Sequence, residues 1–240
     1  DRLPIGKDEL LKTFKPEEVR RFYHDWYRPN LMAVVVVGDI SKEKAEEMIK
    51  KHFAGIQNPK NEKPREYAEI KAYKGGEAMV VTDKEATNEQ FILTFSGRPI
   101  KAEKTLGDYK THLVRSIFTQ MLNKRYSELA QSSTPPFIFA NAFVGSFISD
   151  KYESFTLMGM PSTDINKTID AAIAEFLKAQ QYGFTASELE LAKKNLLSNV
   201  EKSYNERNST ESSVFVEEYI NNFLNEEPIP GISNEYNYYK

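Results

Sequence analysis

The longest run of apolar residues, Leu31 to Val37, places the strongest limit on the fold. The run is rich in β-branched valine and contains no polar residue that could face water. Such a run is typical of a strand buried on both faces, so we expect a sheet that is covered by helices. It is far shorter than the roughly 20 apolar residues that a membrane-spanning helix needs, and no transmembrane helix is predicted.

Segments with helical and strand-like spacing follow one another along the rest of the chain. Apolar side chains that recur every three or four positions predict helices, and short β-branched or aromatic segments predict strands. The first predicted helix begins at Pro16. The others cover residues 41–53, 105–129, 165–182, 185–204 and 213–224. The further predicted strands cover residues 78–82, 90–95, 137–148 and 152–160, and the last two form a hairpin through residues 149–151.

The order of these elements predicts the fold class. From Leu31 onward the order is β-α-β-β-α-β-β-α-α, and its first six elements match the split β-α-β arrangement. We therefore predict an α+β fold, a ferredoxin-like sheet covered by long helices, with extra C-terminal helices. Gly183 is expected to end one helix, and Thr185 with Glu188 has the spacing of a capping box for the next. The tail, residues 226–240, contains two prolines and a glycine and is expected to be irregular.

Composition excludes several classes of function. The formal net charge is −3 and both signs are spread along the chain, which argues against a nucleic-acid-binding protein with a basic face. The sequence contains no cysteine, so disulfides, thiol nucleophiles and cysteine metal sites are excluded. Strand aromatics such as Phe139, Phe143 and Phe147 occur in RNA-recognition domains, but the basic residue and glycine that begin that motif are missing.

The three histidines do not have the spacing of a zinc peptidase. H-E-x-x-H and H-x-x-E-H motifs place two histidines four positions apart on one helix face, whereas the nearest pair here, His24 and His52, is 28 positions apart. His112 has Asp108 four residues before it, and we expect these two to form a solvated helix pair. The sequence therefore predicts no catalytic residue and no metal ligand in this chain.

The other common catalytic motifs are missing as well. The sequence contains no G-x-S-x-G, no G-x-x-x-x-G-K-[ST] and no G-x-G-x-x-G. The carboxylates Asp83, Glu85 and Glu89 are expected to lie in a solvated loop. Arg125 and Glu128, three residues apart on a predicted helix, are expected to pair with each other and not with a substrate.

Several short blocks near the start occur in an order that resembles the pitrilysin/insulinase family of zinc peptidases. The long predicted helix also resembles that family, over Phe118 to Leu129. The early blocks are Arg2 to Gly6 (RLPIG), Phe14 to Glu17 (FKPE), Phe22 to Asn30 (FYHDWYRPN) and Ala33 to Asp39 (AVVVVGD).

The resemblance implies that this chain is the second, companion domain of a half-molecule. Members of the family are clamshells of two halves that enclose a chamber for peptides, and the first domain of the active half binds zinc through H-x-x-E-H. Residues 1–30 would be a connector and helix leading in from that missing upstream domain, residues 31–225 the companion domain, and residues 226–240 a tail. An arginine and a tyrosine that steady the substrate in the second half correspond here to Ala130 and Phe137. The resemblance thus assigns no substrate-binding residue to this chain.

The expected function follows from this position. The chain would form part of the chamber wall of a zinc metalloendopeptidase, with Zn²⁺ held by the upstream domain. Its partners would be that domain, the second half of the polypeptide, and a peptide substrate. The style of the linker favours the bacterial cell envelope or periplasm as the compartment. Two alternatives remain open: a domain of an inactive scaffold relative, and an unrelated ferredoxin-like binding module.

Overall fold

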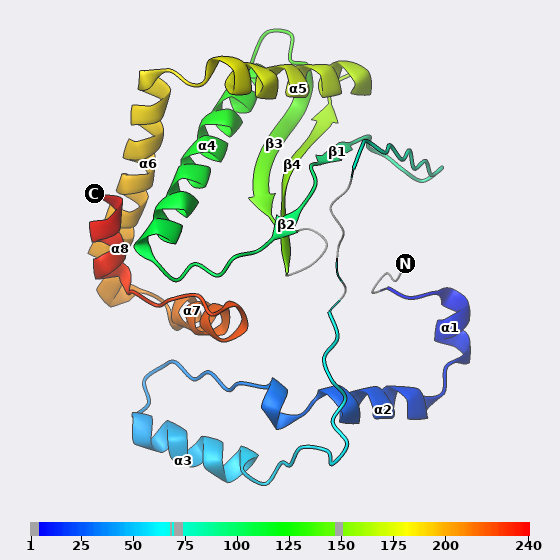
Figure 1. Ribbon diagram of the computed structural model, residues 1–240, viewed down its shortest axis with the longest axis vertical. Helices are drawn as coiled ribbons and strands as arrows, with labels where there is room; N and C mark the ends of the chain where they lie inside the picture. The colour runs from blue at the N-terminus through cyan, green and yellow to red at the C-terminus, as the bar shows by residue number, and fades with distance from the viewer. Residues whose placement is uncertain (1–4, 68, 70–73, 147–150) are drawn as a thin grey trace. The chain divides into compact units, whose positions relative to one another are not determined.

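The structure is a computed structural model that describes residues 5–67, 69, 74–146 and 151–240 (Figure 1). Contacts within the chain divide it into two compact units. The first unit comprises Asp1–Ala68 and Glu211–Leu224, and the second unit comprises Glu69–Thr210 and Asn225–Lys240. The sheet and the clustered apolar core both belong to the second unit.

The sheet of the second unit is antiparallel and is built around β4 (Tyr152–Pro161). β3 (Phe137–Gly145) pairs with β4 along one side, and β1 (Phe91–Thr94) pairs with it along the other. The short β2 (Arg98–Pro99) pairs with the first residues of β4. The antiparallel pairing of β3 with β4 confirms the predicted hairpin pair, whose connecting residues 149 and 150 lie outside the described residues.

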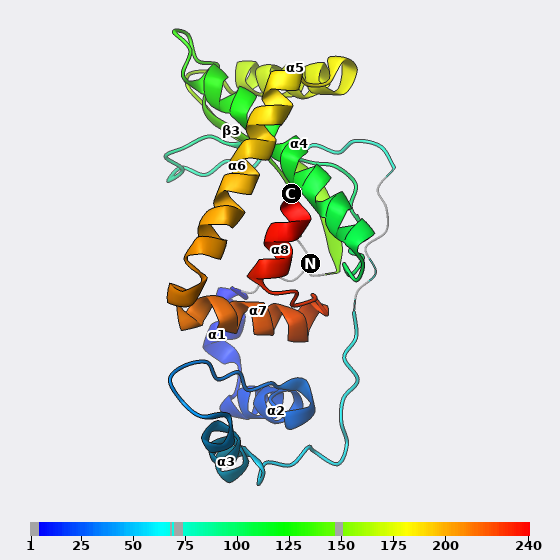
Figure 2. The same cartoon turned by 90° about the vertical axis from the view of Figure 1, so that its left-hand side faces the viewer.

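Long helices cover this sheet and each other. α4 (Leu106–Ala130) packs against β3, and α5 (Ile165–Tyr182) packs against β4. α6 (Ala186–Asn205) packs on α4, and Figure 2 shows the two helices crossing. A short 3-10 turn (Arg207–Ser209) follows α6. None of the helices in the described part of the chain is both long and apolar enough to cross a membrane.

Side chains and glycine set the helix boundaries. The Thr105 and Asp108 side chains form a capping box at the start of α4. The predicted capping box of Thr185 and Glu188 begins α6 and is confirmed. α5 ends at Gly183, as predicted. The φ of Gly183 is 71°, which suits glycine and would strain a residue with a side chain.

The core lies between α4, α5 and the sheet. Its fully buried side chains include Leu122 and Tyr126 from α4, Phe137 from β3 and Leu157 from β4. Gly159 is needed beside them, because an added Cβ would come within 2.9 Å of the Phe139 carbonyl oxygen. This packing confirms the predicted fold class, a helix-covered α+β sheet.

α4 also protects the outer edge of β3. The Asn123 side chain donates to the Ala142 carbonyl oxygen at 2.9 Å and accepts from the Ala142 amide at 2.7 Å. One amide side chain thus replaces the neighbouring strand at that point. Such cover matters because an unpaired sheet edge is a template for aggregation.

The first unit is built of helices without a sheet among its described residues. These are α1 (Asp8–Thr13), α2 (Pro16–Trp26), a 3-10 turn (Pro29–Leu31), α3 (Lys42–Phe53) and α7 (Ser212–Asn225). α3 begins at Ser41, whose hydroxyl accepts from the Lys44 amide at 3.2 Å. The predicted N-cap of this helix is therefore confirmed.

Two predicted strands are not formed by the described residues. The segment 32–37 makes no strand pairing, and Val34 and Val36 are 43% and 48% exposed. Residues 78–82 also remain unpaired. Both predictions were wrong for this structure because a β-branched sequence becomes a strand only when a neighbouring backbone bonds to it.

The prediction of an irregular tail is also wrong. Residues Ile232–Tyr239 form helix α8, which packs along α6 in Figure 2. Tyr236 stacks on Tyr204 and donates to Glu201, and Tyr238 meets Tyr109 edge to face. These aromatic contacts stabilise a helix that the prolines and glycine just before it did not indicate.

Candidate functional site

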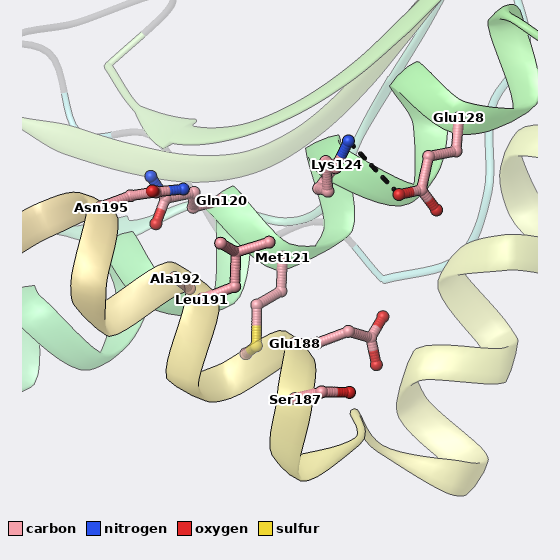
Figure 3. Close-up of a pocket in the computed structure, with 9 residues that line it drawn as sticks. All are labelled: Gln120, Met121, Lys124, Glu128, Ser187, Glu188, Leu191, Ala192 and Asn195. Carbon is pink, nitrogen blue, oxygen red and sulfur yellow. Dashed lines mark ion pairs between the residues drawn. The ribbon is translucent and has the colours of Figure 1, made fainter.

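A hollow lies between α4 and α6 in the second unit (Figure 3). Its volume is about 410 Å³, within the range of small-ligand sites. Met121, Leu191 and Ala192 give it an apolar middle, and the remaining lining residues are polar or charged. The full lining consists of Gln120, Met121, Lys124 and Glu128 from α4 and Ser187, Glu188, Leu191, Ala192 and Asn195 from α6.

The two ends of the hollow differ in charge. In Figure 3 Gln120 and Asn195 lie together at one end, and Lys124 pairs with Glu128 at the other, at 3.3 Å. The buried Oε1 of Gln120 accepts no hydrogen bond from any described group. The hollow could therefore hold an apolar side chain beside one hydrogen-bond donor.

Beside the hollow, Arg125 ties three helical elements together. Its guanidinium donates to both carboxylate oxygens of Glu188, at 2.5 and 2.9 Å, and to Glu175 at 3.3 Å. It also donates to the Gly183 carbonyl oxygen at 3.1 Å and lies 4.5 Å from the centre of the Phe184 ring. This Arg125 cluster links α4 to α5, to the turn after α5, and to α6.

The same cluster fixes the charge of Glu188. The hydrogen bond from Arg125 lowers the pKa of the Glu188 carboxyl to about 2, with help from the Thr185 amide and hydroxyl. The Glu188 carboxylate raises the pKa of Arg125 in return. A carboxylate that is ionised and fully engaged at neutral pH is a poor general acid or base.

Other lining groups offer no catalytic pair. The Ser187 hydroxyl lies 3.0 Å from the Thr185 hydroxyl, which is not a base, and no histidine lines the hollow. Nucleophilic catalysis by serine needs an adjacent base. The hollow has the chemistry of a contact surface.

The histidines lie apart from this hollow. His24, on α2, meets the Tyr23 ring edge to face at 5.8 Å, and His52 lies in the last turn of α3. His112, on α4, has its Nδ1 3.0 Å from a Glu103 oxygen. All three side chains are exposed.

The predicted helix pair of Asp108 and His112 is wrong. Asp108 is occupied by the Lys101 ammonium at 2.7 Å and by its capping box with Thr105, and these partners hold the pKa of its carboxyl well below the usual range. His112 turns to Glu103 instead. Lys101 engages one carboxylate oxygen of Asp108 and Thr105 engages the other, which leaves neither for a residue one turn later.

The predicted pair of Arg125 and Glu128 is wrong as well. Arg125 reaches Glu188 and Glu175, which lie 63 and 50 residues away in sequence, and Glu128 pairs with Lys124. Spacing along one helix could not reveal partners on two others. Phe137, which the resemblance compares with a tyrosine that steadies the substrate, is fully buried, and its ring meets that of Tyr126 edge to face.

The described residues do not fit a zinc centre. Within residues 5–67, 69, 74–146 and 151–240, no three histidine, aspartate or glutamate side chains are placed to hold a metal ion. A catalytic zinc normally has three protein ligands. That this chain holds no catalytic or metal-binding residue stays a prediction.

Comparison with known proteins identifies a family. The model of the peptidase M16 inactive domain matches residues 13–196. Two similar proteins are "Zinc protease PQQL-like" of Arabidopsis thaliana and "Probable zinc protease PqqL" of Haemophilus influenzae, 25% and 27% identical over 236 and 237 residues. Each alignment covers 98% of this chain but only 22% and 25% of the relative.

Solved structures share the fold. The crystal structure of the periplasmic protease PqqL from Escherichia coli matches all of this chain with a TM-score of 0.83 and 24% identity, and this chain covers 26% of it. The structure of the first half of that protease gives the same TM-score, and this chain covers 51% of it. The chain thus spans about a quarter of the length of its relatives.

Proposed function

This chain belongs to the peptidase M16 inactive-domain family, and from this premise we propose that it is the non-catalytic second domain of a zinc metalloendopeptidase. The family match over residues 13–196 carries this proposal, supported by relatives that are named zinc proteases and are about four times longer. In this proposal the zinc and the general base belong to an upstream domain, because the described residues of this chain do not fit a metal site.

The part played by this chain is mechanical. The helix-covered sheet forms a stretch of the chamber wall, and the Arg125 cluster keeps α4, α5 and α6 in fixed positions. Residues 1–30 lead in from the upstream domain. The hollow between α4 and α6 offers a peptide an apolar middle and the Gln120 oxygen, whereas the charged groups Lys124, Glu128 and Glu188 of its lining are already paired. The affinity of the wall for substrate is therefore weak.

The compartment belongs to the proposal too. The structurally similar protein from Escherichia coli is a periplasmic protease. We place the protein in the bacterial cell envelope by that likeness.

The test is made in the full-length protein. All three histidines of this chain are replaced together, His24→Ala, His52→Ala and His112→Ala, since each is exposed and its loss should leave the fold intact. We expect unchanged zinc content by mass spectrometry of the metal, and cleavage of a fluorogenic unfolded peptide within about twofold of wild type. The chelator-treated wild-type protein is the control for loss of metal.

Two results would contradict the proposal. Loss of zinc from the triple variant would place ligands in this chain. A wild-type full-length protein that holds no zinc and cleaves no peptide would instead support the inactive scaffold relative.

A further inference from the structure

A second pocket lies in the second unit, where the tail meets the start of α4. Tyr109, in the first turn of α4, and Tyr238, on α8, meet edge to face at 5.4 Å, and both line this tyrosine pocket. Leu106, Pro228 and Pro230 extend its apolar wall. Its volume is about 250 Å³, below the range of sites for whole small-molecule ligands. The tyrosine pocket therefore has room for a single long side chain.

The charged groups of the tyrosine pocket are mainly carboxylates. Glu103, Glu227 and Glu235 line it, and the first and last of these are half-buried. Lys104 also lines the pocket, but its ammonium pairs with the Glu226 carboxylate. Three carboxylates beside one ammonium leave the lining with an excess of negative charge. Because a charge near a protein surface is screened less than one in bulk water, this excess favours a cation as the occupant.

The titration of Tyr109 reflects the same negative charge. Burial raises the pKa of the Tyr109 hydroxyl, and the neighbouring Tyr239 hydroxyl and the Glu235 and Glu103 carboxylates raise it further. Glu103 is partly engaged, since one of its oxygens lies 3.0 Å from Nδ1 of His112. The negative charge of the carboxylates thus acts at the aromatic wall, and aromatic rings themselves attract cations.

An apolar wall beside carboxylates suits a long side chain with a cationic end. Lysine and arginine bury their aliphatic stems against apolar surface, and their charged ends lie near anions or over aromatic rings. Leu106 lines the tyrosine pocket and is 63% exposed, so it offers an apolar contact to a residue next to the bound side chain. A free diamine or a free amino acid would leave that contact unused. These features favour a peptide as the source of the cation.

We infer that the tyrosine pocket binds one lysine or arginine side chain of a peptide substrate, so that the protein favours peptides with basic residues. The inference rests on the proposed function, because it takes the ligand to be a peptide that the full-length protein cleaves. One side chain adds little affinity to a wall that binds peptides weakly. Its effect is to select among peptides, because a neutral side chain of the same length gains nothing from the carboxylates.

Fluorescence anisotropy with the full-length, chelator-treated protein measures this binding without cleavage. The probes are two N-terminally labelled unfolded peptides that differ at one position, which is lysine in one and norleucine, with the same stem and no charge, in the other. We expect the lysine peptide to bind about tenfold more tightly at low salt, and the preference to shrink in about 1 M salt. Equal binding of the two peptides would overturn the inference. Lysine amide should compete at least about tenfold more weakly than the peptide, and equal competition would overturn the assignment to a peptide.

Substitutions locate the preference at the tyrosine pocket. Glu235→Gln should lower the preference for lysine about threefold, whereas Glu190→Gln, which removes a 70% exposed carboxylate of α6 outside the pocket, should leave it unchanged. Tyr238→Leu should lower it by a similar factor and Tyr238→Phe should retain it, because a cation is attracted by the ring and not by the hydroxyl. Binding of the norleucine peptide is the control for folding of each variant.

Two results with these variants would overturn the inference. One is a preference for lysine that Glu235→Gln leaves unchanged, and the other is a preference that Glu190→Gln lowers equally. Zinc content and cleavage are measured separately. A protein that holds no zinc but prefers the lysine peptide would refute the proposed function alone, and a protein that holds zinc and cleaves both peptides without preference would refute the inference alone.

Discussion

Replacing Arg125 with methionine tests whether the Arg125 cluster holds the helices of the second unit together. Methionine keeps much of the side-chain length and its contact with the Phe184 ring but removes every hydrogen bond. The variant leaves the Glu188 and Glu175 carboxylates without their guanidinium partner, and Glu175 is only 7% exposed. Glu175 retains its ion pair with Lys178, at 3.1 Å.

The size of the effect follows from burial and from the number of bonds lost. The side chains of Arg125 and Glu188 are 18% and 26% exposed, so solvent screens the pair only in part. Removing one partner from a buried ion pair costs about 3–5 kcal/mol, and partial exposure places this variant near the lower limit, at about 3 kcal/mol. The double variant with Glu188→Gln should show a coupling of about 1.5 kcal/mol between the two residues.

Urea unfolding of the chain measures this free energy. Far-UV circular dichroism and hydrogen exchange in α5 and α6 are suitable signals, because the single tryptophan, Trp26, lies in the first unit. Lys124→Met is the matched control: its ion pair with Glu128 is 55% and 63% exposed, and its loss should cost less than about 0.5 kcal/mol. A loss below about 1 kcal/mol for Arg125→Met, with no coupling to Glu188, would refute the idea that the Arg125 cluster holds the helices together.

Three further outcomes are expected. In the folded protein the pKa of Glu188 is lowered from its usual 4.5 to about 2, so the stability that Arg125 confers is fully present above pH 4.5. The difference in free energy of unfolding between wild type and Arg125→Met, measured in urea, should therefore shrink as the pH falls from 4.5 toward 2. Asn123→Ala leaves both backbone groups of Ala142 unpaired and should cost about 2 kcal/mol, with faster aggregation seen by light scattering at equal fraction unfolded. Gly159→Ala forces a Cβ against a backbone carbonyl oxygen and should lower the free energy of unfolding by about 1–3 kcal/mol, whereas Gly107→Ala, with more room, should be neutral or stabilising.

The features that the sequence predicted well are those set by near neighbours. The capping box of Thr185 and Glu188 and the stop at Gly183 depend on residues within one turn, and both are present. The paired strands β3 and β4 follow one another along the chain and needed no distant partner to be recognised. The helix-covered sheet was therefore predictable in outline.

The contacts that define the candidate site depend on residues far apart in sequence. The hollow joins residues 120–128 to residues 187–195, and no local pattern indicates that α6 crosses α4 at these positions. Arg125 looked like a partner for Glu128 because helical spacing is the one distance that a sequence gives directly. Because α6 crosses α4, Arg125 forms two hydrogen bonds with the Glu188 carboxylate, which is less exposed to solvent than that of Glu128.

The wrong prediction for residues 32–37 has a different physical origin. Hydrophobicity and β-branching state what environment a segment needs, and Leu31 to Val37 needs cover on both faces. The second unit buries its apolar side chains among its own residues: Leu122, Tyr126 and Phe137 are fully buried within it. The first unit has no comparable core, because Arg28 is the one buried residue among those that the structure describes there. Hydrophobicity and β-branching thus indicate the environment that this segment requires, and the prediction failed because the described residues do not provide it.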